Sequence, residues 1–174
     1  GWRYMMGIPK ELALGQEQIE EIFSTQWNLR IATVGPGRRI NVTPMWFVWV
    51  GGKIYLYARG QKVINLRRNP NCTVLVDRNE KYAELQGIMM LATGVVLEDA
   101  VAEQADPHLA EARVQIGKKY HEGQGQPPVA GPGLSTATAA GSTRRWLVII
   151  PEKIVTWDNF KLGANRESRG RQRP

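Results

Sequence analysis

The stretch with the clearest chemical meaning is a group of basic residues at the start of an expected helix. Residues 54–70, IYLYARGQKVINLRRNP, read as a strand that passes through a glycine into a helix. Lys62 lies in the first helical turn and Arg59 just before it. A helix start presents free backbone N–H groups and the positive end of the helix dipole, so this pattern predicts a phosphate site. The competing interpretation is that these basic side chains are ordinary solvated surface charge.

Side chains for other chemistries are scarce. Cys72 is the single cysteine, which excludes an intrachain disulfide and a multi-cysteine metal site. The two histidines, His108 and His121, are not at a metal-ligand spacing. The sequence has neither a Gly-x-Ser-x-Gly motif nor a dinucleotide glycine fingerprint. Redox chemistry in this protein therefore requires a bound cofactor.

The formal charge of +7 suits an anionic partner. Four of the positive charges are arginines within residues 166–174, and without these four side chains the formal charge is +7 − 4 = +3. Such a composition predicts a disordered basic tail over 163–174. No apolar run reaches the length of a membrane span, and we expect a cytoplasmic protein that does not bind membranes.

The elements that must position the basic cluster are mostly strands. Gly51-Gly52 permits the positive φ angles of a tight hairpin turn, Gly94 suggests a bulge or sharp bend, and Pro151 interrupts the last extended region. Six or seven strands with short turns predict a mainly β (α+β) fold, an antiparallel barrel with short flanking helices. The expected extended segments are 29–35, 40–50, 53–58, 71–77, 87–97, 144–150 and 153–157.

Three helices are expected around these strands. Residues 11–24 show helical spacing of apolar side chains, and 61–68 form a short helix that ends before Pro70. Asp106-Pro107 should cap a third helix, whose apolar side comprises Leu109, Ala112, Ile116 and Tyr120. Residues 123–143 are rich in Gly, Pro, Ala, Ser and Thr, which predicts a mobile loop or lid.

The segment 40–50 indicates a partner subunit. It is apolar on consecutive residues from Met45 to Val50, so both of its faces should be covered. A barrel interior and a second copy of the chain would do this, with Trp46 and Trp49 on opposite faces. Burial of the whole run within one larger monomer is the alternative. Pro44 favours an edge strand or a bulge, because proline cannot donate to a ladder.

Several of these segments together resemble a known family. They are RIATVGPGRRINVTPMWFVWVGGKIYLYA, QKVINLRRNPNCTVLVD, YAELQGIMMLATGVVLED and IIPEKIVTWDNFKL, within residues 11–162. The chain resembles the pyridoxamine 5'-phosphate oxidase-like, FMN-binding split-barrel proteins, in particular the F-420- or FMN-dependent oxidoreductase branch. The resemblance implies one split-barrel domain over 1–162, a homodimer, and a bound FMN or coenzyme F-420.

The resemblance also implies a cofactor site. Lys62, Arg59 and Gln61 would bind the cofactor phosphate. Thr43, Pro44, Met45, Tyr57 and Ala58 would line the ring or the ribityl chain. Tyr82 and Gln86 match positions that approach the cofactor, often across the dimer, and Trp157 would form a wall of the same pocket. Packing alone is the alternative role for Met45, Tyr57 and Trp157, and Gln86 could be a satisfied loop amide.

The implied activity is hydride transfer between the cofactor and a small electron-poor organic substrate, with no catalytic side chain required. The histidine and basic signature of true pyridoxamine-phosphate oxidases is missing, so vitamin B6 oxidation is not expected. The positive charge slightly favours the anionic F-420 over FMN. A non-enzymatic carrier of flavin or haem is the alternative. Nucleic-acid binding is not expected, because the tryptophans lie in apolar runs rather than between basic residues.

Overall fold

A computed structural model describes residues 7–122 and 137–163. In the first range, side chains are described as far as Tyr120. The fold is mainly β with short helices, as expected. The strands are β1 (Leu29–Val34), β2 (Ile40–Met45), β3 (Val48–Val50), β4 (Lys53–Ala58), β5 (Asn71–Arg78), β6 (Gln86–Leu97) and β7 (Arg145–Asp158). The helices are η1 (Lys10–Leu12), α2 (Gln16–Thr25), η2 (Pro36–Arg38), α3 (Gln61–Arg68), η3 (Tyr82–Glu84), α4 (Ala100–Ala105), α5 (Leu109–Gly117) and the π-helical η4 (Lys118–Glu122).

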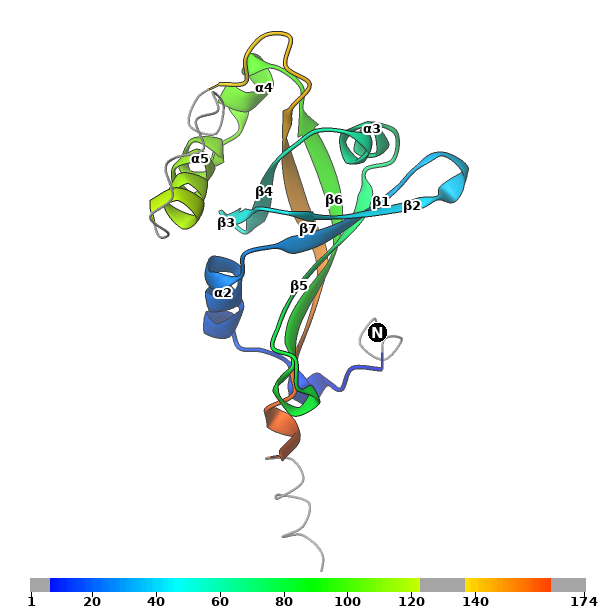
Figure 1. Cartoon of the computed structure of the whole chain (residues 1–174), viewed down its shortest axis with the longest axis vertical. Coiled ribbons are helices and arrows are strands. Elements are labelled where there is room, and N and C mark those ends of the chain that lie inside the picture. The colour runs from blue at the N-terminus through cyan, green and yellow to red at the C-terminus, as the bar shows by residue number, and fades with distance from the viewer. Residues whose placement is uncertain (1–6, 123–136, 164–174) are drawn as a thin grey trace, which may run out of the picture.

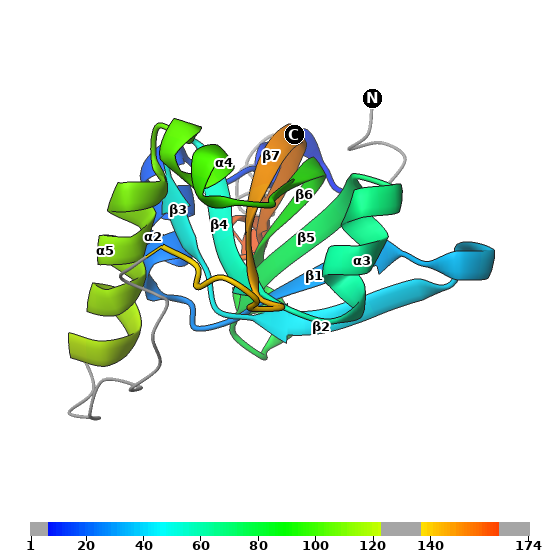
Figure 2. The same ribbon diagram turned by 90° about the horizontal axis from the view of Figure 1, so that it is seen from above.

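The seven strands form one antiparallel sheet in the order β2-β1-β5-β6-β7-β4-β3. The two edge strands, β2 and β3, are consecutive in the chain and separated only by Trp46 and Phe47. The sheet must therefore curl until its two edges meet at this crossover, and Figure 2 shows the curl from above. This confirms the expected split barrel. Pro44 lies in β2, an edge strand of the sheet, as expected for a residue that lacks a backbone N–H.

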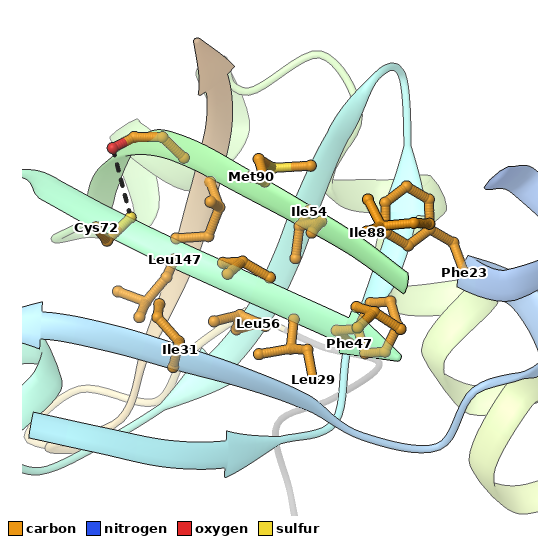
Figure 3. Close-up of a cluster of buried hydrophobic side chains, with 14 of the residues drawn as sticks. Phe23, Leu29, Ile31, Phe47, Ile54, Leu56, Cys72, Ile88, Met90 and Leu147 are labelled. Atoms are coloured by element: carbon orange, nitrogen blue, oxygen red, sulfur yellow. Dashed lines mark hydrogen bonds between the residues drawn. The ribbon is translucent and has the colours of Figure 1, made fainter. Parts of the chain in front are cut away.

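The concave side of the sheet holds the main core. Figure 3 shows Ile31, Ile54, Leu56, Ile88 and Met90 converging from three strands on one interior. Phe23 closes one end of it from α2, and Leu147 adds β7. Cys72 is buried in the same cluster with its Sγ 3.7 Å from the Ala92 carbonyl oxygen.

One helix packs on each side of the curled sheet. The α3 helix packs against β1 and β6 on the core side, where Leu66 reaches Gly94. On the convex side, Leu109, Ala112 and Ile116 of α5 pack against Trp146 and Tyr55 in a second cluster. Figure 1 shows α3 and α5 on opposite sides of the sheet.

One expectation about the C-terminal half was wrong, and one of the two roles expected for Gly94 is excluded. β7 is a single strand rather than two, because Pro151 and Glu152 lie in a bulge: Leu91 pairs with Lys153 while Ala92 pairs with Pro151. Gly94 is consequently not the bulge. It lies where an added Cβ would be 2.8 Å from the Leu66 side chain, so it permits the close approach of α3.

The helical region after β6 also differs from the expectation. A separate helix α4, capped by Asp99, precedes the expected one, and His108 rather than Asp106 is the N-cap of α5. Asp106 instead accepts hydrogen bonds from the Tyr55 hydroxyl (2.8 Å) and the His108 backbone N–H (3.0 Å). The expected loop 123–143 and tail 163–174 lie mainly outside the described residues.

Candidate functional site

A glycine, Gly60, precedes the first residue of α3 and occupies the N-cap position. Gly60 has φ 85° and no side chain that caps the helix, so the chain turns directly from β4 into α3. Lys62, in the first turn, folds back and donates from Nζ to the Arg59 carbonyl oxygen at 3.1 Å. The half-buried lysine therefore lies beside the uncapped first turn of the helix.

A short hydrogen-bond chain fixes this helix start to the sheet. Gln61 Nε2 donates to Asn65 Oδ1 at 2.7 Å, and Asn65 Nδ2 donates to Thr33 Oγ1 of β1 at 3.1 Å. Asn65 and Thr33 are fully buried. The Gln61 amide is thus engaged within the protein, and its role is to anchor the first turn.

The electrostatics of the helix start favour an anion. Burial lowers the pKa of Lys62, and the neighbouring Arg59 charge lowers it further. Among the described residues, neither side chain forms an ion pair with a carboxylate. The site therefore holds two cations without a counter-charge, next to the positive end of a helix.

The inner face of β2 lies beside this helix. Asn41 pairs with Thr33, and Thr43 pairs with Ile31, so both point to the side where Asn65 packs. Asn41 Oδ1 and Thr43 Oγ1 are buried without a hydrogen-bond partner. Unpartnered buried polar atoms are rare and require an explanation. Both atoms are enclosed in this structure, and a ligand with hydroxyl groups that enters between β2 and α3 would satisfy both, so the residues present fit the ribityl chain and phosphate of a flavin or deazaflavin.

We name these four residues, Asn41, Thr43, Arg59 and Lys62, the α3 site. Other expected site residues lie apart from it. Pro44 is exposed on the outer face of β2, whereas Met45 packs against the main core. Ala58 is buried in that core, while Tyr57 points to the opposite face and packs against Trp146 with ring centroids 5.1 Å apart.

Three further expected residues lie at the other end of β6. Gln86 begins β6 and is 5% exposed, and Trp157 lies directly over Gly87, its ladder partner. Tyr82 is 75% exposed in η3. We name Tyr82, Gln86 and Trp157 the distal group.

The α3 site and the distal group are separated within one chain. Gln86 and Gly94, where Leu66 of α3 packs, are eight positions apart along β6, which is about 26 Å at strand spacing. In Figure 1, α3 lies beside the upper half of β6 and the turn before β6 lies at the lower end. The α3 helix, which starts directly after Arg59 and Gly60, therefore lies toward the opposite end of β6 from η3 and Gln86.

Gln86, alone of the distal group, lines an open hollow of about 600 Å³, together with Glu21, Arg78 and Phe160 among others. Arg78 bridges Glu21 and Gln86: its Nε donates to Gln86 Oε1 at 2.7 Å, and its two Nη atoms donate to the two Glu21 carboxylate oxygens at 3.0 and 3.1 Å. Arg78 holds the pKa of Glu21 below its ordinary value.

Sequence reasoning missed two of these residues. Asn41 precedes Thr43 by two positions, and two polar side chains on one face of an otherwise apolar strand were a usable signal. Arg78 gave no such signal, because its partners Glu21 and Gln86 come from other elements.

The described residues contain no cluster of His, Cys, Asp and Glu that could hold a metal ion. None of the helices in the described ranges has the length and apolar character that crossing a bilayer requires.

Comparison with known proteins agrees with this architecture. The family model "Pyridoxamine 5'-phosphate oxidase" matches residues 16–158. The conserved hypothetical protein Rv2991 from Mycobacterium tuberculosis is similar in structure, with TM-score 0.68, 21% identity, and coverage of 89% of this chain and 91% of that one. The search of curated proteins gave no match.

Two other solved structures share the fold. One is HutZ, a haem storage protein from Vibrio cholerae, with TM-score 0.62, 17% identity, and coverage of 82% of this chain and 94% of that one. The other is an F-420 reductase, with TM-score 0.52, 18% identity, and coverage of 78% and 94%. At these identities the likeness concerns the fold alone.

Proposed function

Because the chain belongs to the pyridoxamine 5'-phosphate oxidase family, we propose that it binds a flavin or deazaflavin and acts as an oxidoreductase on a small electron-poor organic substrate. The observation that carries this proposal is the uncompensated pair Lys62 and Arg59 beside the uncapped start of α3. A cofactor phosphate supplies the missing negative charge and accepts hydrogen bonds from the first-turn N–H groups.

The inner face of β2 supports the same ligand class. Asn41 Oδ1 can only accept a hydrogen bond, and Thr43 Oγ1 can donate or accept. A ribityl chain carries hydroxyl groups that do both, and it is attached directly to the phosphate. Asn41 and Thr43 therefore bind the chain, while Lys62 and Arg59 bind the phosphate.

The cofactor is FMN or coenzyme F-420. Either one, when bound and reduced, supplies a hydride. The chain's own residues hold and orient it, and no side chain of the α3 site is a general acid or base. The net charge of +7 favours F-420 slightly, because its tail is anionic.

The active unit is a homodimer in this proposal. Because α3 lies toward the opposite end of β6 from the distal group, a second chain brings its distal group to the α3 site of the first in this arrangement. The outer face of β2 exposes Ile40 and Val42, each at 59%, and offers an apolar surface for such a partner.

A non-enzymatic carrier of flavin or haem is the second candidate, and the shared fold with the haem storage protein HutZ favours keeping it. An anaerobic assay separates the two. The protein is loaded with reduced FMN or F-420 and mixed with a panel of quinones, enones and nitroaromatics. Cofactor reoxidation that depends on one of these compounds supports the oxidoreductase. Tight binding without turnover of any of them supports the carrier.

A further inference from the structure

Glu21, Arg78 and Gln86 form a hydrogen-bonded row at the hollow beside the distal group. They come from α2, the end of β5 and the start of β6, and Arg78 and Gln86 are directly paired across the ladder. Arg78 is held on one side by both oxygens of Glu21 and on the other by Gln86, with all three distances between 2.7 and 3.1 Å. The guanidinium is therefore fixed in position.

The row determines which way the Gln86 amide points. Its oxygen and nitrogen have nearly the same shape and are assigned from their partners. An arginine side chain has only donors, so the Gln86 atom that faces Arg78 must be the acceptor Oε1. The Nε2 group must then face the other way.

The outward side of Gln86 is available to a ligand. Within the described part of the chain, Gln86 Nε2 donates to no protein atom, and it is not among the enclosed unpartnered atoms. Gln86 lines the open hollow of about 600 Å³ although the residue as a whole is 5% exposed. Gln86 Nε2 therefore carries N–H donors that no described protein atom accepts, on a residue that lines the hollow.

We propose that Arg78 is a positioning residue that fixes Gln86 as a hydrogen-bond donor to the cofactor, so that Gln86 selects an acceptor atom such as a ring carbonyl oxygen or an unprotonated ring nitrogen. The proposal rests on the proposed function, in which the distal group of one chain contacts the cofactor held at the α3 site of another. Glu21 contributes indirectly, because its carboxylate holds the Arg78 guanidinium in position.

Replacing Gln86 by glutamate separates this role from a structural one. The new carboxylate would keep an oxygen for Arg78, and the charged pair would be at least as strong as the original bond. It would have no donor for the ligand. Gln86→Glu should therefore keep or raise the melting temperature while it weakens FMN and F-420 binding about tenfold or more.

The second variant acts on Arg78. Arg78→Met frees the Gln86 amide to turn, and binding should weaken by about three- to tenfold. Arg30→Met is the matched control. Arg30, on β1, forms a single, more exposed ion pair with Asp77 of β5 at 2.8 Å, and no hydrogen bond joins it to Gln86, so its removal should leave binding unchanged.

Both cofactors are titrated into each variant, with absorbance and fluorescence as the readout and melting temperature measured in parallel. Unchanged binding in Gln86→Glu, while the wild type binds, would overturn the inference and leave the proposed function standing. Equal losses in Arg78→Met and Arg30→Met would also overturn it. A wild-type protein that binds neither FMN nor F-420 would overturn the proposed function and this inference with it.

Discussion

At the residue scale, the phosphate interpretation of Lys62 depends on charge that lacks a partner. Substituting Lys62 by methionine keeps most of the apolar stem and removes the cation. Loss of one charge-assisted contact to a phosphate should weaken FMN or F-420 binding about 10- to 100-fold. Arg68→Met is the control with the same change in net charge, because Arg68 is exposed in the last turn of the same helix. Equal effects of the two substitutions would indicate general electrostatic attraction rather than a site.

A second lysine predicts a dependence of stability on pH. Lys119 Nζ donates to the carbonyl oxygens of Phe23 (2.8 Å) and Phe47 (3.2 Å) and lies 3.8 Å from the Phe47 ring centroid. Burial lowers the pKa of Lys119 to about 8, whereas a lysine in the unfolded chain titrates near ~10.4. Between these values the unfolded state binds more protons, so this group makes the free energy of unfolding rise with pH.

The effect is measured by urea unfolding of the wild type and of Lys119→Met between about pH 7.5 and 9.5, the range set by the two pKa values. The wild type should gain stability relative to the variant, by at most about 1.4 kcal/mol per pH unit, the limit for one proton. The range stops below the tyrosines, because burial raises the pKa of Tyr55 and Tyr120 in the folded state and their effect has the opposite sign. Parallel pH curves for the two proteins would rule out this role of Lys119.

At the element scale, the sequence predicted those helices and turns whose limits are set by residues within the segment itself. The range of α3 and the turn at Gly51-Gly52 follow from residues within each segment, and the structure has both, with φ of 61° and 74° at the two glycines. β7 was misjudged because Pro151 normally ends a strand, and only pairing with distant β6 shows that a bulge accommodates it.

The candidate site was only partly predictable for the same reason. Lys62 and Arg59 belong to one local motif. The unpartnered atoms of Asn41 and Thr43, and the row from Glu21 to Gln86, depend on which strands and helices lie together. The family resemblance placed both Tyr57 and Ala58 in the pocket, whereas strand alternation turns the two side chains to opposite faces.

Two glycines with opposite surroundings, Gly87 in β6 and Gly117 in α5, give opposite predictions for substitution by alanine. A Cβ on Gly87 would overlap the Trp157 ring, so Gly87→Ala should lower the free energy of unfolding by about 1–3 kcal/mol and shift tryptophan fluorescence. Gly117, in α5, has nothing within 4 Å of its Cβ position. Gly117→Ala should raise stability by about 0.5–1 kcal/mol through helix propensity. Both are measured by chemical denaturation, and an equally stable Gly87→Ala protein would contradict the described packing.

At the scale of the whole molecule, the proposed cofactor site requires two chains. Val42→Asp places a charge on the exposed apolar face of β2, so it should convert the protein to monomers and abolish cofactor binding together. Val101→Asp is the control, because Val101 is 75% exposed on α4, away from β2. Sedimentation velocity gives the oligomeric state. A Val42→Asp protein that remains dimeric, or a monomer that binds the cofactor normally, would contradict the proposed arrangement.

The central claim is that one flavin-type site is assembled from Lys62 of one chain and Gln86 of another, and subunit mixing tests it most directly. Lys62→Met and Gln86→Glu, each deficient alone, are unfolded together, refolded and titrated with FMN and F-420. Random pairing makes about half of the dimers mixed, and each mixed dimer has one intact site of two. We predict that about a quarter of all sites recover wild-type affinity. No recovery, with both variants folded and dimeric, would contradict a site shared between chains.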